Sequence, residues 1–566
     1  MDYQKDIAEI LHHVLEDELS VDEIINLLEK PKSDDHGDLA FPAFQLAKVF
    51  RKAPQEIAGN LADQIEDPLI DRVQAVGPYL NFFLNRKTVG QAVVQEILAA
   101  GSAFGEQNIG GNENVILDMS SPNIAKPMSM GHLRSTVIGN ALANIYQKIS
   151  FNPVKINYLG DWGTQFGKLI CAYKKWGDPE KVRENPIQEL NELYVHFHEA
   201  AEEEPELEDE GREWFRRLEN GDEEAIELWQ WFREESLKEF NKVYDRLEIT
   251  FDSFNGEAYY NDKMDEVVQL IDDKNLLKED QGAQVVYLDD YDLNPALIKK
   301  QDGATLYMTR DVTAAINRYN KFEFNRALYV VGQDQNYHFQ QLQAVLKEMG
   351  YDWADEVLHI AFGLISIDGE KMSTRRGKVV LLNDVLDEAV NKAYEQISQK
   401  NPDLDNKEVV SEEVGVGAVI FNDLHNERTN NFDFDLDEIV KFEGETGPYV
   451  QYSRARAMSM LRKADDQGID YKDTGIYNLS DDYSWRIIKY LHEFPSVIVS
   501  AYEKNEPSIV ARHAVRLASA FNQFYANVRV LDESEERPAR LALVHALTIV
   551  LKESLRLLGV SSPDKM

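Results

Sequence analysis

Apolar residues near the N-terminus repeat with the period of a helix. The spacing i, i+3, i+4, i+7, i+8 is followed by Ile7, Ile10, Leu11, Val14 and Leu15, which predicts one buried helix face. Residues 78–85 (PYLNFFLN) form a short apolar and aromatic run that predicts a strand. A polar segment with three glycines, 105–114 (GEQNIGGNEN), follows and indicates a boundary. We therefore expect an N-terminal α+β domain over residues 1–110.

The next segment alternates between strand-like and helix-like patterns. A buried-type strand at 115–120 (VILDMS) precedes a helix from about 131 to 149, and a second strand-like run covers 154–162. The same alternation returns at 326–335 and 357–367. Strand–helix–strand units predict a parallel sheet with a ligand crevice at its carboxyl edge. We expect a Rossmann-type α/β domain over 111–380.

A charged insertion interrupts this domain at about 170–285. Residues 199–239 carry 17 acidic and 5 basic side chains, a net charge of -12. Aromatic and leucine residues recur there at helical spacing, which favours solvated helices with one buried face over a cluster of catalytic carboxylates. From 381 onward the pattern is almost wholly helical, and predicts a connecting region (381–440) and a C-terminal α-helical bundle (441–566).

Composition narrows the class of protein. The 566 residues carry a net charge of -40, and 43% are hydrophobic, which is typical of a folded chain and not of an acidic disordered one. The single cysteine, Cys171, excludes a disulfide framework and a zinc site with several cysteines. The acidic N-terminus does not resemble a targeting peptide, and no apolar run reaches the roughly 20 residues that span a bilayer. We expect a cytoplasmic protein without a membrane partner.

The average charge argues at first against nucleic acid as a partner, because proteins that bind it are usually basic, at least locally. The charge is unevenly distributed, however. Residues 441–566 carry 17 acidic and 17 basic side chains and are neutral. A polyanionic partner is therefore not excluded, and its recognition would depend on shape, stacking and a few placed arginines.

Residues 120–142 contain the first candidate site. A strand ends at Ser120, and a helix opens near Gly131 and His132. A helix N-terminus attracts phosphate, and a glycine there allows close approach to the backbone. Lys126 and Asn123 add polar groups to the same turn, although a histidine in this position can also simply cap or pack.

Two further segments contain residue types suited to binding phosphate or RNA. Residues 369–380 (GEKMSTRRGKVV) include Lys371 among four basic residues, which suits a phosphate-binding loop or a plain basic surface loop. Residues 442–463 combine aromatic rings that can stack on unpaired bases with arginines that can contact phosphates. These are Tyr449, Tyr452, Arg454 and Arg456. The same pattern is also typical of an ordinary amphipathic helix that does not bind RNA.

These segments together resemble a known family. Residues 120–142 resemble the HIGH region of class I aminoacyl-tRNA synthetases, in the extended SPN-x-x-K-P…GHLRS form of the arginyl-tRNA synthetases. Residues 369–380 resemble the KMSKS loop, and 442–463 resemble the opening of the helical DALR domain that binds the anticodon. Residues 37–48 and 77–84 resemble the family's N-terminal additional domain, which contacts the tRNA elbow. The resemblance extends over nearly the whole chain.

Two positions depart from the family motifs. Ser129 stands where many relatives have the first histidine of HIGH, and Thr374 replaces the second lysine of KMSKS. In this family a lysine just before HIGH, matched here by Lys126, is thought to compensate for the missing charge. The two departures are therefore mutually consistent.

The resemblance implies an arginine–tRNA ligase that uses ATP and Mg²⁺, with L-arginine and tRNA(Arg) as partners, and a monomeric state. Lys126, His132 and Lys371 would be catalytic, and Pro122, Asn123, Gly131, Met372 and Ser373 would complete the ATP site. A guanidinium needs carboxylates in its plane and an aromatic wall. The family's arginine pocket maps onto Asp118, Asn123, Glu257, Tyr307, Asp311 and Gln335. No protein-bound metal site is expected.

Two alternatives remain. A cysteinyl-tRNA synthetase shares both ATP motifs, but its zinc site needs more thiolates than one cysteine provides. A catalytically inactive paralogue that serves as an RNA-binding module is compatible with Ser129 and Thr374, although the retained His132 and Lys371 argue against it.

Overall fold

A computed structural model describes residues 3–31, 33–301, 307–367, 369–371, 380–472, 475 and 477–566. Contacts divide the chain into two compact units. Unit 1 consists of Met1–Phe104, Ser453–Pro495 and Arg516–Glu553, and unit 2 of Gly105–Tyr452, Ser496–Val515 and Ser554–Met566. The C-terminal helices thus contribute residues to both units.

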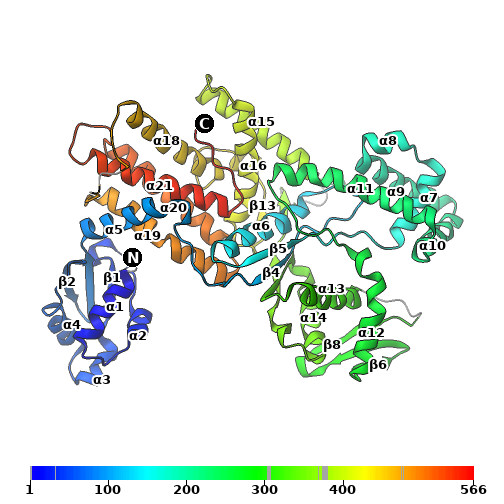
Figure 1. Ribbon diagram of the computed structural model, residues 1–566, viewed down its shortest axis with the longest axis horizontal. Coiled ribbons are helices and arrows are strands. Elements are labelled where there is room, and N and C mark those ends of the chain that lie inside the picture. The colour runs from blue at the N-terminus through cyan, green and yellow to red at the C-terminus, as the bar shows by residue number, and fades with distance from the viewer. Residues whose placement is uncertain are drawn as a thin grey trace. The chain divides into compact units, whose positions relative to one another are not determined.

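The N-terminal part of unit 1 is an α+β domain. Its antiparallel sheet has the order β1 (Leu39–Pro42), β3 (Tyr79–Leu84), β2 (Ile70–Val76) (Figure 1). The helices are α1 (Tyr3–Val14), α2 (Val21–Leu27), α3 (Leu46–Phe50), α4 (Pro54–Ala62) and α5 (Arg86–Ala100). Ile7 and Leu11 are fully buried on α1, which confirms the predicted helix face, and β3 confirms the strand predicted at 78–85.

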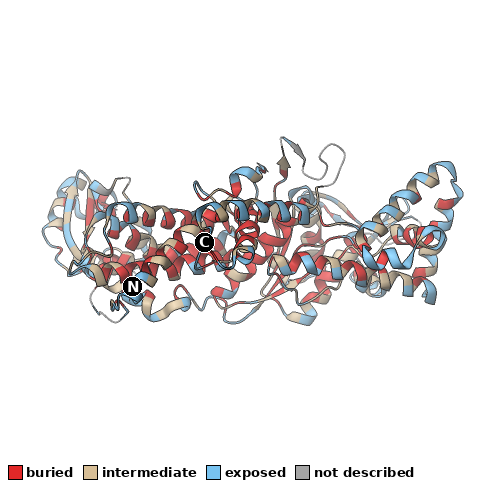
Figure 2. Cartoon of the chain, turned by 90° about the horizontal axis from the view of Figure 1, so that it is seen from above, coloured by how far each residue is buried: buried red, intermediate tan, exposed pale blue. Residues whose placement is uncertain are grey.

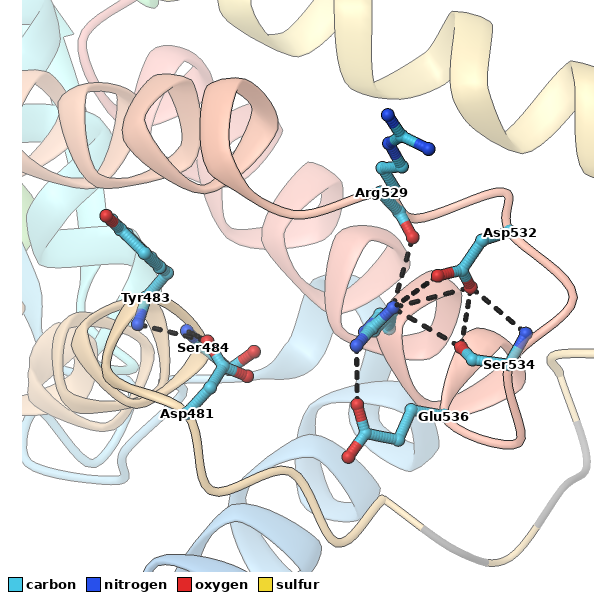
Figure 3. Close-up of polar contacts among 8 residues, drawn as sticks. Asp481, Tyr483, Ser484, Arg529, Asp532, Ser534 and Glu536 are labelled. Carbon is cyan, nitrogen blue, oxygen red and sulfur yellow. Dashed lines mark hydrogen bonds and ion pairs between the residues drawn. The ribbon is translucent and has the colours of Figure 1, made fainter.

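Four C-terminal helices also contribute to unit 1 with part of their length, namely α18 (Gly447–Asp466), α19 (Asp482–Lys504), α20 (Ser508–Asn527) and α21 (Arg537–Leu557). Gly90 on α5 permits close packing, since a Cβ there would lie 3.0 Å from Ile488 Cδ1 on α19. Asp481 caps α19 by accepting from the amides of Tyr483 (3.1 Å) and Ser484 (2.9 Å) (Figure 3).

One arginine organises the connection between α20 and α21. The Arg540 guanidinium donates to the carbonyl of Arg529 (3.1 Å) and to the carboxylates of Asp532 (3.3 Å) and Glu536 (2.5 Å). The side chain of Arg529 points away from this cluster (Figure 3). The loop is therefore held by several donors of a single side chain.

Unit 2 is built on a parallel sheet. Its order is β10 (Val357–Phe362), β9 (Arg326–Gly332), β4 (Asn114–Asp118), β5 (Asn152–Ile156), and all three pairings are parallel. The helix α6 (Leu133–Lys148) joins β4 to β5, and α14 (Asn336–Glu348) joins β9 to β10. This confirms the predicted Rossmann-type alternation and places the ends of β4 and β9 at one edge.

The helix α6 lies at the centre of unit 2. It contacts β4, β5, β9 and the later helix α16 (Lys407–His425). Nearly every residue of α6 is buried, including the polar Arg134 and Thr136. A helix that is buried all round needs partners for its polar groups. Arg134 accordingly forms an ion pair with Asp423 on α16, with 3.2 Å between its Nε atom and a carboxylate oxygen.

The insertion between β5 and β9 is only partly helical. Helices α7 (Thr164–Trp176), α8 (Pro179–Glu184), α9 (Pro186–Glu203), α10 (Glu206–Glu219) and α11 (Glu223–Arg246) come first. Then α12 (Met264–Asp273) precedes an antiparallel sheet of β6 (Leu277–Asp280), β7 (Ala283–Leu288) and β8 (Leu293–Lys299). The helices expose much of their outer surface (Figure 2). The sequence analysis did not predict this sheet.

The remaining elements of unit 2 complete the helical region. They are α13 (Tyr307–Phe322), α15 (Leu382–Lys400), α17 (Leu436–Ile439) and a small sheet of β12 (Glu370–Lys371), β11 (Ile365–Ile367) and β13 (Phe432–Asp433). No helix in the described ranges combines the length and apolar character needed to cross a bilayer.

Candidate active site

The chain turns sharply between β4 and α6, and we call residues 119–132 the β4–α6 turn. Ser120, Ser121 and Ala125 have φ angles of 72°, 54° and 61°. This left-handed conformation costs a residue with a side chain on the order of 1 kcal/mol. Strain of this kind persists where the surroundings fix the backbone.

Buried polar side chains hold the strained backbone in place. The donors are three amides of the β4–α6 turn, and the acceptors lie on α6, on α11 and directly after β5. The bonds join Ser120 N to Ser135 Oγ (2.8 Å), Ser121 N to Asn157 Oδ1 (3.1 Å) and Ala125 N to Ser236 Oγ (2.9 Å). The turn is therefore determined by tertiary contacts and not by its own sequence.

Asn123 and Lys126 are exposed on this turn, while Pro122 is buried. The Gly160 amide donates to the Pro122 carbonyl (3.1 Å). A Cβ at Gly160 would lie only 2.0 Å from Asn123 Oδ1, so glycine is required there for the Asn123 side chain to keep its position. The neighbouring Asp161 is buried, and its carboxylate accepts from Arg233 Nε (3.0 Å). Asp161 thus anchors the insertion.

His132 ends a short 3₁₀ turn that leads into α6. Its Nδ1 atom accepts from the Ser129 amide (3.1 Å), which leaves the proton on Nε2 as a donor. Desolvation lowers the pKa of His132 below its ordinary value, so the ring is neutral at pH 7. Gly131 is exposed beside it. A neutral N–H donor at an open helix start suits a phosphate oxygen.

Lys126 lies on this turn, and the last residue of the 369–380 segment contacts it. The Lys126 Nζ atom lies 5.4 Å from the ring centroid of Tyr194 on α9, a cation–π contact. The Met130 amide donates to the carbonyl of Val380, the end of the 369–380 segment (3.1 Å). The backbone of Lys371 pairs with Ser366 in the small sheet. Met372, Ser373 and Thr374 lie outside the described residues, as does the side chain of Lys371.

A second group of polar residues surrounds the start of α13. Tyr307, the first residue of α13, is 69% exposed. Asp311 follows one helical turn later, and its carboxylate lies 2.6 Å from His338 Nε2 on α14. Gln335 is exposed just before α14. The predicted pair on α13 is thus on one face, as the spacing of four residues requires.

Glu257 contributes a largely buried carboxylate to the same region. Desolvation raises the pKa of Glu257 to about 7, although Arg310, 3.5 Å away on α13, opposes the shift. Asp311 also raises this pKa through charge repulsion. A further cation placed between these carboxylates would therefore be attracted.

Asp118 occupies the end of β4 and is 3% exposed. Its carboxylate lies 2.7 Å from Arg318 Nη1 on α13. Burial raises the pKa of Asp118, and Arg318 opposes that shift. The rings of Tyr158 and Tyr329 flank the guanidinium of Arg318 at 5.2 and 5.4 Å. Asp118 thus has an internal cationic partner, which the sequence analysis did not identify.

We refer to Asp118, Glu257, Tyr307, Asp311 and Gln335 as the acidic pocket. Sequence reasoning missed Arg310, Arg318 and His338, which hold its carboxylates. Arg318 follows Asp311 by seven residues on α13, a spacing that places both side chains on one helix face. This spacing was a signal in the sequence that could have identified Arg318. A hollow of about 960 Å³ adjoins the pocket and is lined by Trp162, Phe215, Tyr259, Lys263, Tyr307 and Arg310, among others.

No group of three or more His, Cys, Asp or Glu side chains within the described ranges is arranged to hold a metal ion. The polar groups on the β4–α6 turn are mainly donors, which suit phosphate oxygens and not a cation.

The residues proposed from the sequence to bind RNA lie on α18. Tyr449, Tyr452 and Arg456 are partly accessible. Arg456 donates to Asn522 (2.6 Å). Arg454 is 3% exposed and donates to the Thr548 carbonyl (3.3 Å), so its guanidinium takes part in helix packing.

Comparisons with known proteins cover the whole chain. Residues 93–436 match the family described as tRNA synthetases class I (R), catalytic domain. Residues 1–84 match the arginyl tRNA synthetase N terminal domain, and 450–566 the DALR anticodon binding domain. The chain is 60% identical to the arginine–tRNA ligase of Enterococcus faecalis and 58% to that of Ligilactobacillus salivarius, over 100% of each chain. The arginyl-tRNA synthetase structure from Thermus thermophilus is 25% identical, with a TM-score of 0.81 and 100% of both chains covered.

Proposed function

We propose, for a chain that belongs to the arginyl-tRNA synthetase family, that the acidic pocket binds L-arginine and that the β4–α6 turn binds the phosphates of ATP. The activity is that of an arginine–tRNA ligase. The observation that carries the proposal is the set of carboxylates around the start of α13, where Glu257 and Asp311 lie close enough to repel each other.

The arginine side chain is a planar cation with five N–H donors. Asp311 and Glu257 would accept from it, with Tyr307 as the aromatic wall and Gln335 as a further polar contact. Asp118 is already paired with Arg318, so it would act with its remaining lone pairs, close to the α-amino group. Asn123, exposed on the β4–α6 turn that follows this strand, would orient the substrate between pocket and turn.

The first step would join arginine to AMP. A carboxylate oxygen of arginine attacks the α-phosphorus, the bond to the bridging oxygen breaks, and pyrophosphate leaves with the electron pair. Charge accumulates on the phosphate oxygens as this occurs, and preorganised donors stabilise it. His132 would donate through Nε2–H, and Lys126 and Lys371 would supply positive charge, with Pro122, Gly131, Met372 and Ser373 shaping the site.

The second step would transfer the arginyl group to tRNA. The 2′-hydroxyl of the terminal adenosine attacks the carbonyl carbon of the adenylate, loses its proton, and AMP departs. The hollow beside Tyr307 has aromatic rings and three cations, Lys263, Lys300 and Arg310, together with three carboxylates, Glu219, Asp262 and Asp265. Its aromatic rings, and not its charge, would accept the unpaired 3′ end of a tRNA by stacking.

Mg²⁺ would enter as part of the nucleotide substrate. This ion keeps several waters and binds phosphate oxygens readily, and the donor-rich turn offers it few ligands. We further expect tRNA(Arg) to contact Tyr449, Tyr452 and Arg456 on α18, and the protein to act as a monomer in the cytoplasm. Arg454 is left out of this surface because it is buried.

ATP–pyrophosphate exchange tests the proposal. The assay is run with each of the twenty amino acids, with and without tRNA(Arg), and with Mg·ATP as the nucleotide. Exchange that depends on arginine alone supports the assignment. Exchange with another amino acid would refute the arginine pocket, and no exchange under any condition would favour an inactive RNA-binding paralogue.

A further inference from the structure

The acidic insertion reaches the β4–α6 turn through two hydroxyl groups of α11. The Tyr244 Oη atom lies 2.7 Å from Ser120 Oγ, and Ser236 Oγ accepts from the Ala125 amide (2.9 Å). Tyr244 is 1% exposed and Ser236 is fully buried. Ser120 and Ala125 are the first and last left-handed residues of the turn. One helix of the insertion therefore holds both ends of the strained backbone.

Tyr244 belongs to a longer series of hydrogen bonds. The Asn157 Nδ2 atom lies 2.9 Å from Tyr244 Oη, Thr136 Oγ1 lies 2.9 Å from Ser120 Oγ, and Thr136 Oγ1 lies 2.7 Å from the His132 carbonyl oxygen. All of these groups are in unit 2. The series begins at the end of β5, crosses to the insertion, returns to the turn and ends on the backbone of His132.

Donors can be identified at both ends of the series. Asn157 Oδ1 accepts from the Ser121 amide, so Nδ2 is the donor toward Tyr244. At the other end, Thr136 Oγ1 is the donor toward Ser120 Oγ and toward the His132 carbonyl. Between Tyr244 and Ser120 either hydroxyl can donate. The Tyr244 and Ser120 hydroxyls therefore lie between an amide donor and a hydroxyl donor.

We propose that Tyr244 is a positioning residue for amino-acid activation, which fixes the β4–α6 turn and His132 relative to each other through this series of hydrogen bonds. The inference rests on the proposed role of that turn at the ATP phosphates. Hydrogen bonds in series strengthen one another. Loss of the central hydroxyl would leave Asn157 Nδ2 without its acceptor and would remove the Tyr244 partner of Ser120 Oγ, next to a backbone that is already strained.

Tyr244→Phe tests this with the loss of one oxygen atom. We expect kcat for ATP–pyrophosphate exchange to fall at least about tenfold, because small displacements of reacting groups cost up to about a hundredfold. The KM values for arginine and ATP should change less than about threefold, since the contacts affected are those that strengthen in the transition state. Assays run well below the melting temperature of each variant.

Tyr146→Phe is the matched control. Tyr146 is also fully buried in unit 2, and its Oη donates to Asn505 Oδ1 (2.7 Å) near the opposite end of α6. The Tyr146→Phe variant should lose thermal stability and keep the wild-type kcat. An equal fall in kcat for both variants, or a kcat for Tyr244→Phe within twofold of wild type, would overturn the proposal.

Thr136→Val interrupts the same series from α6 and decides the question if Tyr244→Phe does not fold. It should lower kcat as well. Where both single variants fold, the kcat of the double variant should be no lower than that of the more affected single variant. Each substitution already interrupts the same series, so their effects should not add. Multiplied losses would show two independent effects and overturn the proposal. If the wild-type protein itself shows no exchange, the proposed function fails instead, so the two failures are distinguishable.

Discussion

The carboxylate of Asp311 lies 2.6 Å from the Nε2 atom of His338, so the helices α13 and α14 are joined at the edge of the acidic pocket. Both side chains remain about one-fifth exposed. His338 fixes the orientation of the carboxylate, whose other lone pairs remain free to accept from a guanidinium.

Asp311→Asn should therefore raise the KM for arginine far more than the KM for ATP. Loss of a charge-assisted contact in a desolvated site costs about 2 kcal/mol or more, on the order of thirtyfold in affinity. Steady-state exchange kinetics measure both constants. Asp355→Asn, which changes an exposed carboxylate paired with Lys347, should change neither. Equal effects of Asp311→Asn on both substrates would count against a guanidinium contact.

Arginine binding should weaken as the pH falls below 7. The pKa of Glu257 is raised to about 7 by burial, so its carboxylate is charged above that pH and becomes protonated below it. The arginine side chain stays cationic throughout, so the attraction is lost on the acidic side. The KM for arginine should rise by up to about tenfold per pH unit below 7.

Glu257→Gln supplies the comparison for this pH dependence. The variant should have a raised KM at pH 8 and a nearly flat profile between pH 6 and 8. If the KM for arginine of the wild-type protein does not change between pH 6 and 8, Glu257 does not bind the charged side chain of arginine.

Lys126→Ala should slow the formation of adenylate in a single turnover by at least about tenfold, because a positive charge near the developing phosphate charge is removed. Affinity for tRNA, measured by filter binding, should not change. Lys126→Arg keeps the charge and should retain more of the rate. An unchanged single-turnover rate in Lys126→Ala would refute the hypothesis that this lysine compensates for the positive charge missing at Thr374.

Arg318→Met should destabilise unit 2 strongly. The pair with Asp118 is 2% and 4% exposed, and removal of one partner of a buried ion pair costs about 3–5 kcal/mol. Thermal unfolding should show a clear fall in Tm. Arg212→Met removes an ion pair with Asp209 in which both side chains are mostly exposed, and should have little effect. Similar shifts in both variants would show that the Asp118 charge does not depend on Arg318.

The sequence alone predicted the parallel sheet. Helical and strand-like periodicity is local information, so β4, α6 and β9 could be placed from it. Asn123, His132, Tyr307 and Asp311 could be proposed as site residues because their motifs are short and continuous. The motif resemblance also predicted the family, which the comparisons confirm over the full chain.

Only the tertiary structure shows which buried polar and charged side chains pair with one another. Arg318 pairs with Asp118, and Tyr244 reaches Ser120, across long stretches of sequence. No local pattern encodes such contacts, because they arise when α11 and α13 pack against the end of β4. The left-handed backbone of the β4–α6 turn has the same origin: its residues do not favour that conformation, and buried hydroxyl and amide groups on α6, on α11 and directly after β5 hold it. The sequence thus predicted where along the chain the candidate site residues lie, and packing determined how their groups are oriented and charged.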